Sequence, residues 1–209
     1  MRLPKKAFAL LALLVGTASA APMVPMHIPM GQKDYRLATA GHYTLDPNHV
    51  GVIARISHVG FSLSVFRFGA VTGKLDWNPT TPEKSELSAT VMTGSIETNV
   101  PKFAQQLVGK DYLNAAVFPQ ARFVSTSFRR RDAMHGDVAG WLTLMGRTVP
   151  LTFHVTLIGA GPGFAGSPVM GHVIGIHAEG QIQVKDFPVP PILSGPIDLT
   201  IDTEFDKLS

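Results

Sequence analysis

The feature that most constrains the fold is an alternation of apolar and polar residues between positions 172 and 185, the cleanest in the chain. In a β-strand, side chains at every second position share one face of the sheet. One face would carry Ile174, Ile176, Ala178, Ile182 and Val184, and the other His177, Glu179, Gln181, Gln183 and Lys185. The pattern predicts an antiparallel strand with one face in a core and the other in water.

Similar runs, separated by Gly, Pro, Asn and Asp, recur along the chain and predict eight or nine strands. They cover residues 43–45, 50–59, 66–77, 86–97, 121–129, 137–144, 149–158, 172–185 and 197–205. Closing such a sheet removes its exposed edges and gives every strand an inner and an outer face. We therefore predict an all-β, eight- or nine-stranded antiparallel barrel, with a two-sheet sandwich as the alternative.

One helical insertion, at about residues 99–115, interrupts the strands. Asn99 or Val100 can cap it, Pro101 suits its first turn, and Gly109 provides a stop. A single apolar stripe is formed by Phe103, Ala104, Leu107 and Val108. Because a lone amphipathic helix must bury its stripe, we expect it to cover one end of the barrel and to shift when a ligand enters.

Residues 1–20 have the pattern of a secretory signal peptide. A basic start (Arg2, Lys5 and Lys6) precedes a short apolar core and the small residues Ala18-Ser19-Ala20. This predicts export to the periplasm, with no stable membrane anchor after cleavage. Residues 21–41 then form a Pro/Met-rich linker, and residues 42–209 form the barrel domain.

The linker contains one candidate metal motif. Met23, Met26, His27 and Met30 place thioethers at a spacing of three beside an imidazole, and such soft ligands suit Cu(I). The alternative is an extended arm with no metal. Elsewhere the sequence has no HxH or HExxH motif, so it predicts no other metal site.

The charge balance argues against a nucleic-acid partner. Three of the eighteen Lys and Arg residues lie in residues 1–20, so the remaining fifteen balance the fifteen Asp and Glu. The chain also has no cysteine and no GxSxG motif, which removes two kinds of nucleophile. We predict that the protein is not an enzyme and has no cofactor; a small-molecule enzyme using His58 and Asp111 is a third possibility.

Five segments, in this order, resemble the YceI-like family of exported, lipocalin-like barrels that bind polyisoprenoids. They are YTLDPNH at residues 43–49, SHVGFS at 57–62, the segment 66–73, DYLN at 111–114 followed by FPQARFVST at 118–126, and GWLTLMGRTVPL at 140–151. The resemblance extends from about residue 43 to residue 207. It implies a long apolar tunnel for an isoprenoid lipid, such as a quinone tail or polyprenyl chain, and a possible homodimer.

A carrier of this kind needs a deep apolar channel with a few polar groups at one end. The residues predicted to line it are His58, Phe61, Phe66, Phe68, Phe103, Leu107, Tyr112, Leu113, Phe123, Trp141, Phe153 and Phe187. The predicted function is carriage or storage of an isoprenoid lipid in the periplasm. The alternative is a structural or stress-response barrel that acts through dimer or partner contacts and holds no lipid.

Overall fold

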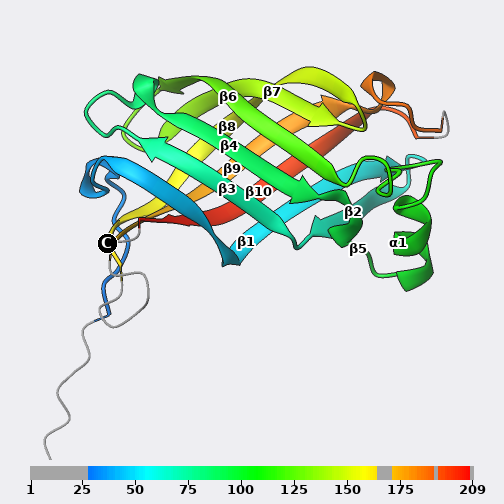
Figure 1. Cartoon of the computed structure of the whole chain (residues 1–209), viewed down its shortest axis with the longest axis horizontal. Coiled ribbons are helices and arrows are strands. Elements are labelled where there is room, and N and C mark those ends of the chain that lie inside the picture. The colour runs from blue at the N-terminus through cyan, green and yellow to red at the C-terminus, as the bar shows by residue number, and fades with distance from the viewer. Residues whose placement is uncertain (1–27, 164–170, 191–192, 208–209) are drawn as a thin grey trace, which may run out of the picture.

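A single curled antiparallel sheet makes up most of the fold (Figure 1). The computed structural model describes residues 28–163, 171–190 and 193–207. Its strands are β1 (Gly41–His58), β2 (Ser62–Phe68), β3 (Val71–Trp77), β4 (Glu86–Met92), β5 (Ile96–Glu97), β6 (Gln120–Arg130), β7 (His135–Leu144), β8 (Arg147–Pro162), β9 (His172–Gln183) and β10 (Pro196–Asp206). The α-helix in these ranges is α1 (Pro101–Leu107). None of the described helices has the length and apolar character needed to cross a membrane.

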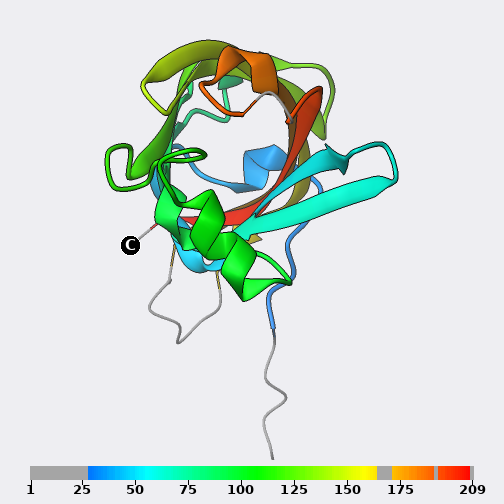
Figure 2. The same ribbon diagram turned by 90° about the vertical axis from the view of Figure 1, so that its right-hand side faces the viewer.

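The first and last strands close this sheet into a barrel. β1 pairs with β10 from Thr44↔Asp206 to Ile56↔Ile197, and its first four residues also pair with β3. The ring therefore runs β1-β3-β4-β6-β7-β8-β9-β10 and returns to β1, as the end-on view in Figure 2 shows. This confirms the predicted all-β antiparallel barrel, with eight strands, and excludes the two-sheet sandwich.

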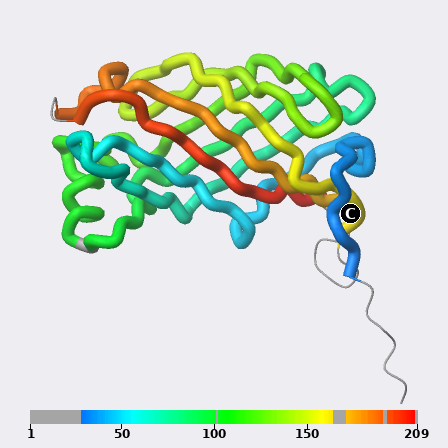
Figure 3. Tube along the Cα trace, turned by 180° about the vertical axis from the view of Figure 1, so that it is seen from behind, coloured from blue at the N-terminus to red at the C-terminus, as the bar shows by residue number. Residues whose placement is uncertain are grey.

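Two strands, β2 and β5, lie outside this ring. The second half of β1 leaves β3 and pairs with β2 from Val52↔Phe68 to His58↔Ser62, and β5 adds two residues to the free edge of β2. The β1–β2 hairpin splays away from the barrel (Figure 2). α1 lies at the same end of the molecule, whereas the 3-10 turn η1 (Tyr35–Leu37) and the C-terminus lie at the opposite end (Figures 1 and 3).

Several element boundaries differ from those predicted. The segment 66–77 is divided between β2 and β3 at Gly69 and Ala70, so the prediction of one strand there is wrong. Residues 43–45 and 50–58 belong to one strand, β1, because the intervening residues form a bulge instead of ending it. The helical insertion is present; α1 is its regular part, and turns continue to residue 117.

The alternation read in residues 172–185 corresponds to the two faces of β9. Ile174, Ala178 and Ile182 are buried, whereas Glu179 and Gln181 are exposed. The inward side chains therefore come from alternate positions, as the barrel requires. The hairpin predicted at residues 145–148 is also present, with the turn at Met145 and Gly146, both at positive φ.

Two glycines on the inner face leave room for a pair of phenylalanine rings. A Cβ atom on Gly180 would lie 2.8 Å from the Phe153 ring, and one on Gly140 would overlap the Phe123 ring and the Val124 carbonyl oxygen. Phe123 and Phe153 meet edge to face, with ring centroids 5.2 Å apart. Glycine at these positions lets large aromatic rings lie flat against the barrel wall.

We predict that Gly140→Ala lowers the free energy of unfolding by about 1–3 kcal/mol, because the added methyl group cannot fit without moving a strand or a ring. Gly94→Ala is the matched control, since no atom lies within 4 Å of its added Cβ. Urea denaturation of both variants measures the effect. Equal midpoints would contradict this packing.

Candidate ligand-binding cavity

An apolar cavity of about 440 Å³ runs inside the barrel, from α1 inward as far as Phe205. All eight barrel strands contribute to its wall, together with β2, α1 and the loops near them. The polar residues on this wall are Ser57, His58, Ser64, Thr93, Tyr112 and Thr203. Its volume lies within the range of about 300–1,000 Å³ that small-molecule sites occupy.

Ten of the twelve residues predicted to line a channel lie on this wall. They are His58, Phe66, Phe68, Phe103, Leu107, Tyr112, Leu113, Phe123, Phe153 and Phe187. They come from β1, β2, α1, the turns after α1, β6, β8 and the chain after β9, so the fold brings together residues far apart in the sequence. Contact between these side chains and a ligand is a prediction.

The other two residues, Phe61 and Trp141, do not line the cavity. Phe61 lies at the tip of the β1–β2 hairpin and is 90% exposed. Trp141 lies on β7 between the inward-facing Gly140 and Leu142, so it points outward and is 51% exposed. Both were selected because they are aromatic. The alternation along β7 would have placed Trp141 correctly.

The exposed polar residues of the wall lie at the mouth, where β1 separates from β3. Ser57 and His58 are exposed there, at the end of β1. The two buried hydroxyls of the wall, Thr93 near α1 and Thr203 farther in on β10, are already used: Thr93 Oγ1 donates to the Phe118 carbonyl at 2.7 Å, and Thr203 Oγ1 donates to the Glu204 carbonyl at 3.3 Å. The interior therefore offers a ligand carbon surface.

α1 covers this mouth. The Phe103 ring on α1 packs against the Phe66 ring on β2, with centroids 6.0 Å apart, and Leu107 is buried. The Tyr112 hydroxyl, in the turn after α1, accepts a hydrogen bond from Gln106 Nε2 at 3.2 Å. The apolar stripe of the short helix thus faces the cavity.

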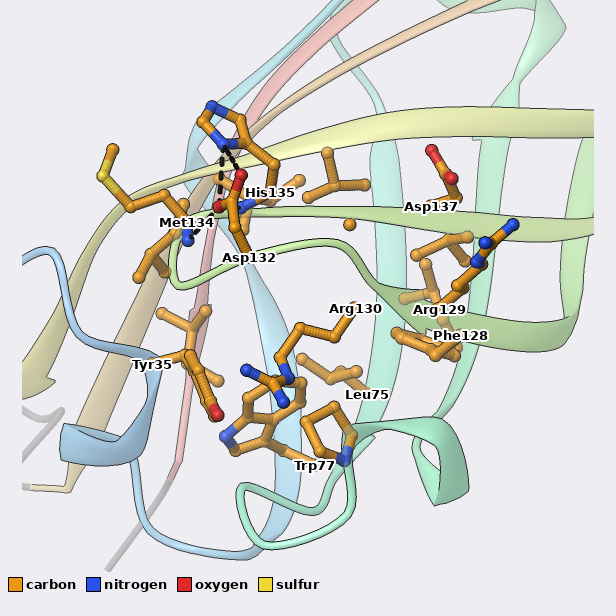
Figure 4. A pocket seen from close by; sticks show the side chains of 18 of the residues that line it. Tyr35, Leu75, Trp77, Phe128, Arg129, Arg130, Asp132, Met134, His135 and Asp137 are labelled. Carbon is orange, nitrogen blue, oxygen red and sulfur yellow. Dashed lines mark hydrogen bonds and ion pairs between the residues drawn. The ribbon is translucent and has the colours of Figure 1, made fainter.

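A smaller pocket of about 130 Å³ continues the bore toward the opposite end (Figure 4). Its wall shares with the main cavity the residues Leu87, Val138, Val155, Ile176 and Phe205. Tyr35 and Trp77 close this end and meet edge to face at 6.1 Å, and the Arg130 guanidinium lies 5.8 Å above the Tyr35 ring. Trp77 Nε1 is buried and has no hydrogen-bond partner among the described residues.

Sequence reasoning did not identify this second end. Tyr35 belongs to the segment predicted as a linker, yet η1 packs on the barrel and Gln32 forms a β-bridge with Ala160. One local signal was available: Asp34 accepts a hydrogen bond from the Arg36 backbone N–H, as an Asp that starts a turn does. The partner strand, β8, lies far along the chain.

The β6–β7 hairpin at this end is stabilised by a carboxylate. Asp132 accepts hydrogen bonds from the backbone N–H groups of Met134 and His135, each at 2.8 Å, and from the His135 ring. These donors, the Met134 N–H above all, lower the pKa of Asp132 to about 2. The group is exposed and stays ionised at neutral pH, where its hydrogen bonds hold the hairpin turn.

Two other predicted sites receive no structural test. Met23, Met26 and His27 of the Cu(I) motif lie outside the described residues, and Met30 is 77% exposed. Within the described ranges, no hydrogen bond joins His58 to the exposed Asp111.

The fold and its cavity define a class: a closed eight-stranded antiparallel barrel built around an apolar bore and covered at one end by a short helix. The chain matches the YceI-like domain over residues 43–205. It is 36% identical over 172 residues to Protein YceI of Escherichia coli O157:H7, covering 80% of this chain and 87% of that one. The chain therefore belongs to the YceI-like family.

Solved structures share the fold. BcnA of Burkholderia cenocepacia superposes with a TM-score of 0.65 at 19% identity, covering 77% of this chain and 98% of BcnA. A YceI protein of Campylobacter jejuni gives 0.64 at 24% identity, covering 74% and 91%. A polyisoprenoid binding domain from Saccharophagus degradans gives 0.54 at 13% identity, covering 80% and 99%.

We predict that Phe153→Ala lowers the free energy of unfolding by about 3 kcal/mol, because it removes a buried ring packed on Phe123. Phe61→Ala should change it by less than about 0.5 kcal/mol, because that ring is in solvent. Denaturant unfolding of both variants tests the inside–outside assignment. A large loss for Phe61→Ala would contradict it.

Proposed function

We propose that this protein is an exported, non-enzymatic lipid-binding barrel that holds a polyisoprenoid chain in its bore, for carriage or storage in the periplasm. The observation that carries the proposal is the cavity: about 440 Å³, walled largely by apolar side chains, with the exposed polar residues Ser57 and His58 at the mouth and the buried hydroxyls already hydrogen-bonded. A hydrocarbon chain with one polar end matches that distribution.

The energetics favour such a guest. Apolar surface moved from water into an apolar site contributes about 25 cal/mol per Å², and a long isoprenoid exposes much of it in water. An unfilled cavity also leaves its lining side chains without dispersion contacts, which a guest restores. A polar head group would lie near His58, Ser57 and Ser64, at the edge of the water.

Two further observations support the cargo class and the location. The Saccharophagus degradans domain that shares this fold is described as polyisoprenoid binding. The signal-peptide pattern of residues 1–20 supports export. An isoprenoid quinone and a polyprenyl chain both fit the proposal, because the wall of the bore recognises the tail.

A second candidate is a barrel that works through protein contacts and carries no lipid. The splayed β1–β2 hairpin favours it, because Val59, Phe61, Leu63 and Val65 are all more than half exposed. Exposed apolar patches of this kind often mark contact surfaces. The two candidates differ in whether lipid is found in the purified protein.

Organic extraction of the purified protein, followed by mass spectrometry, tests the proposal. We expect a long-chain isoprenoid lipid in stoichiometric amount from the wild type and little from Ala178→Phe, whose added ring fills the bore. Thr152→Phe, which places the same ring on the outer face of β8, is the matched control and should retain the lipid. A folded wild type without lipid, whose melting temperature no isoprenoid raises, would contradict the proposal.

The helix should act as the lid of the bore. In the variant Phe66→Cys/Phe103→Cys, a short bifunctional thiol reagent would tie α1 to β2, and the chain has no other cysteine. We expect cross-linking to slow lipid uptake at least about tenfold, because α1 can no longer move aside. The same variant without the reagent, and each single cysteine variant with it, are the controls. Unchanged uptake would place the entrance elsewhere.

A further inference from the structure

The small pocket at the end of the bore opposite α1 contains a polar atom that the lipid-binding role does not explain. Trp77 Nε1 is buried and forms no hydrogen bond with any described residue. An indole N–H can only donate, and in a buried tryptophan this group usually finds an acceptor. A buried donor left unpaired costs free energy, so the pocket favours a ligand that brings an acceptor to it.

Two further donors lie beside this indole. The Tyr35 and Trp77 rings meet edge to face with centroids 6.1 Å apart, and the Arg130 guanidinium lies 5.8 Å from the centroid of the Tyr35 ring. Figure 4 shows the polar ends of the three side chains turned toward one another. They come from η1, β3 and β6. An indole and a guanidinium offer donors and no acceptor, and a tyrosine hydroxyl can also donate, so the group suits a carboxylate.

The charge of Arg130 favours an anionic acceptor. In the part of the chain that the structure describes, Arg130 forms no ion pair, whereas its neighbour Arg131 pairs with Asp137 at 2.7 Å. The other carboxylate on the pocket wall, Asp132, already accepts hydrogen bonds from His135. Figure 4 shows Asp132 turned toward His135 and away from Arg130. The guanidinium is therefore available to a carboxylate from outside the chain.

The size of the pocket limits the rest of the ligand to about one six-membered ring. The volume is about 130 Å³, and the wall includes the apolar side chains of Leu75, Phe128, Leu157 and Ile174. An apolar cavity of about 150 Å³ in another protein binds benzene. A ring of that size can fill this pocket while a carboxylate on it reaches the three donors.

We propose that Tyr35, Trp77 and Arg130 form a second binding site, which takes a small carboxylic acid whose apolar body is about one ring in size. The carboxylate accepts hydrogen bonds from Trp77 Nε1 and Arg130, and the ring lies in the pocket. Arg130 is exposed and Tyr35 is partly buried, so the charged end of the acid stays close to water. This site does not rest on the proposed function, because its three donors lie at the end of the bore opposite the mouth.

The two tryptophans of the chain provide a direct readout. Trp77 lies on the pocket wall, whereas Trp141 is 51% exposed on the outer face of β7. NMR spectroscopy of the ¹⁵N-labelled protein gives one indole N–H signal from each, and the variant Trp141→Phe assigns them. A hydrogen bond to a carboxylate moves the proton signal of the indole N–H downfield.

The test is a titration of the labelled protein with cyclohexanecarboxylate. We expect a saturable downfield shift of the Trp77 signal and no shift of the Trp141 signal. Cyclohexylmethylammonium has the same ring but carries donors instead of acceptors, so it should move neither signal.

Two variants and a matched control locate the carboxylate. We expect binding at least about tenfold weaker in Arg130→Gln, which loses a charged donor, and about threefold weaker in Tyr35→Phe, which loses a neutral one. Arg122→Gln removes the same charge from an exposed position on β6 that does not belong to the pocket wall. It should bind as the wild type does.

The proposal fails if the Trp77 signal does not move, if the ammonium compound moves it as far, or if Arg122→Gln loses as much affinity as Arg130→Gln does. Equal affinity for cyclohexanecarboxamide, a neutral acceptor on the same ring, would contradict the assignment to an anion. Should Arg130→Gln not fold, Tyr35→Phe removes a single hydroxyl from the same site. Unaltered affinity in Tyr35→Phe would then overturn the proposal.

Discussion

The fold depends on the antiparallel pairing of β1 with β10, because this contact turns an open sheet into a closed wall. β1 is long enough to serve several partners: its first residues pair with β3, its second half pairs with β2, and its other edge pairs with β10. β1 therefore closes the barrel through its pairing with β10, and its separation from β3 leaves the gap that forms the mouth. Since β3 no longer borders the second half of β1, the wall there is completed by β2, β5 and α1.

The bore exists because the inner face mixes very large and very small side chains. Phe123 and Phe153 lie against the wall over Gly140 and Gly180 and pack edge to face on each other. Protein interiors are normally close-packed, and unfilled volume costs stability. A lasting apolar cavity in this barrel is explained most simply by a guest that fills it.

The local sequence pattern predicted the features that follow from the alternation of side chains along a strand. The inward positions of β9 and the class of fold follow from the side-chain period of two, whereas the aromatic residues of the wall were selected by residue type. Trp141 was misplaced because residue type was given more weight than its parity on β7. The local pattern also predicted β2 and β3 as one strand. The break at Gly69 is visible only from the pairing of β2 and β3 with other strands.

Features that depend on distant pairing could not be predicted. The packing of Tyr35 on the far end requires β8, more than a hundred residues along the chain, and local sequence carries no record of it. The register shift in β1 at residues 46–49 brings Asp46 and His49 near Glu204 on β10. Asp46-Pro47-Asn48 was read as the end of a strand; the pairing with β10 shows that the strand continues beyond it.

The central claim is that the bore is open along its length and occupied by a slender hydrocarbon guest in the native protein. A high-resolution crystal structure of the protein, purified without detergent from the cells that produce it, tests this most directly. The account predicts continuous elongated electron density from α1 past Phe153 to Phe205. Side chains that meet across the lumen and leave no room for a guest would contradict it.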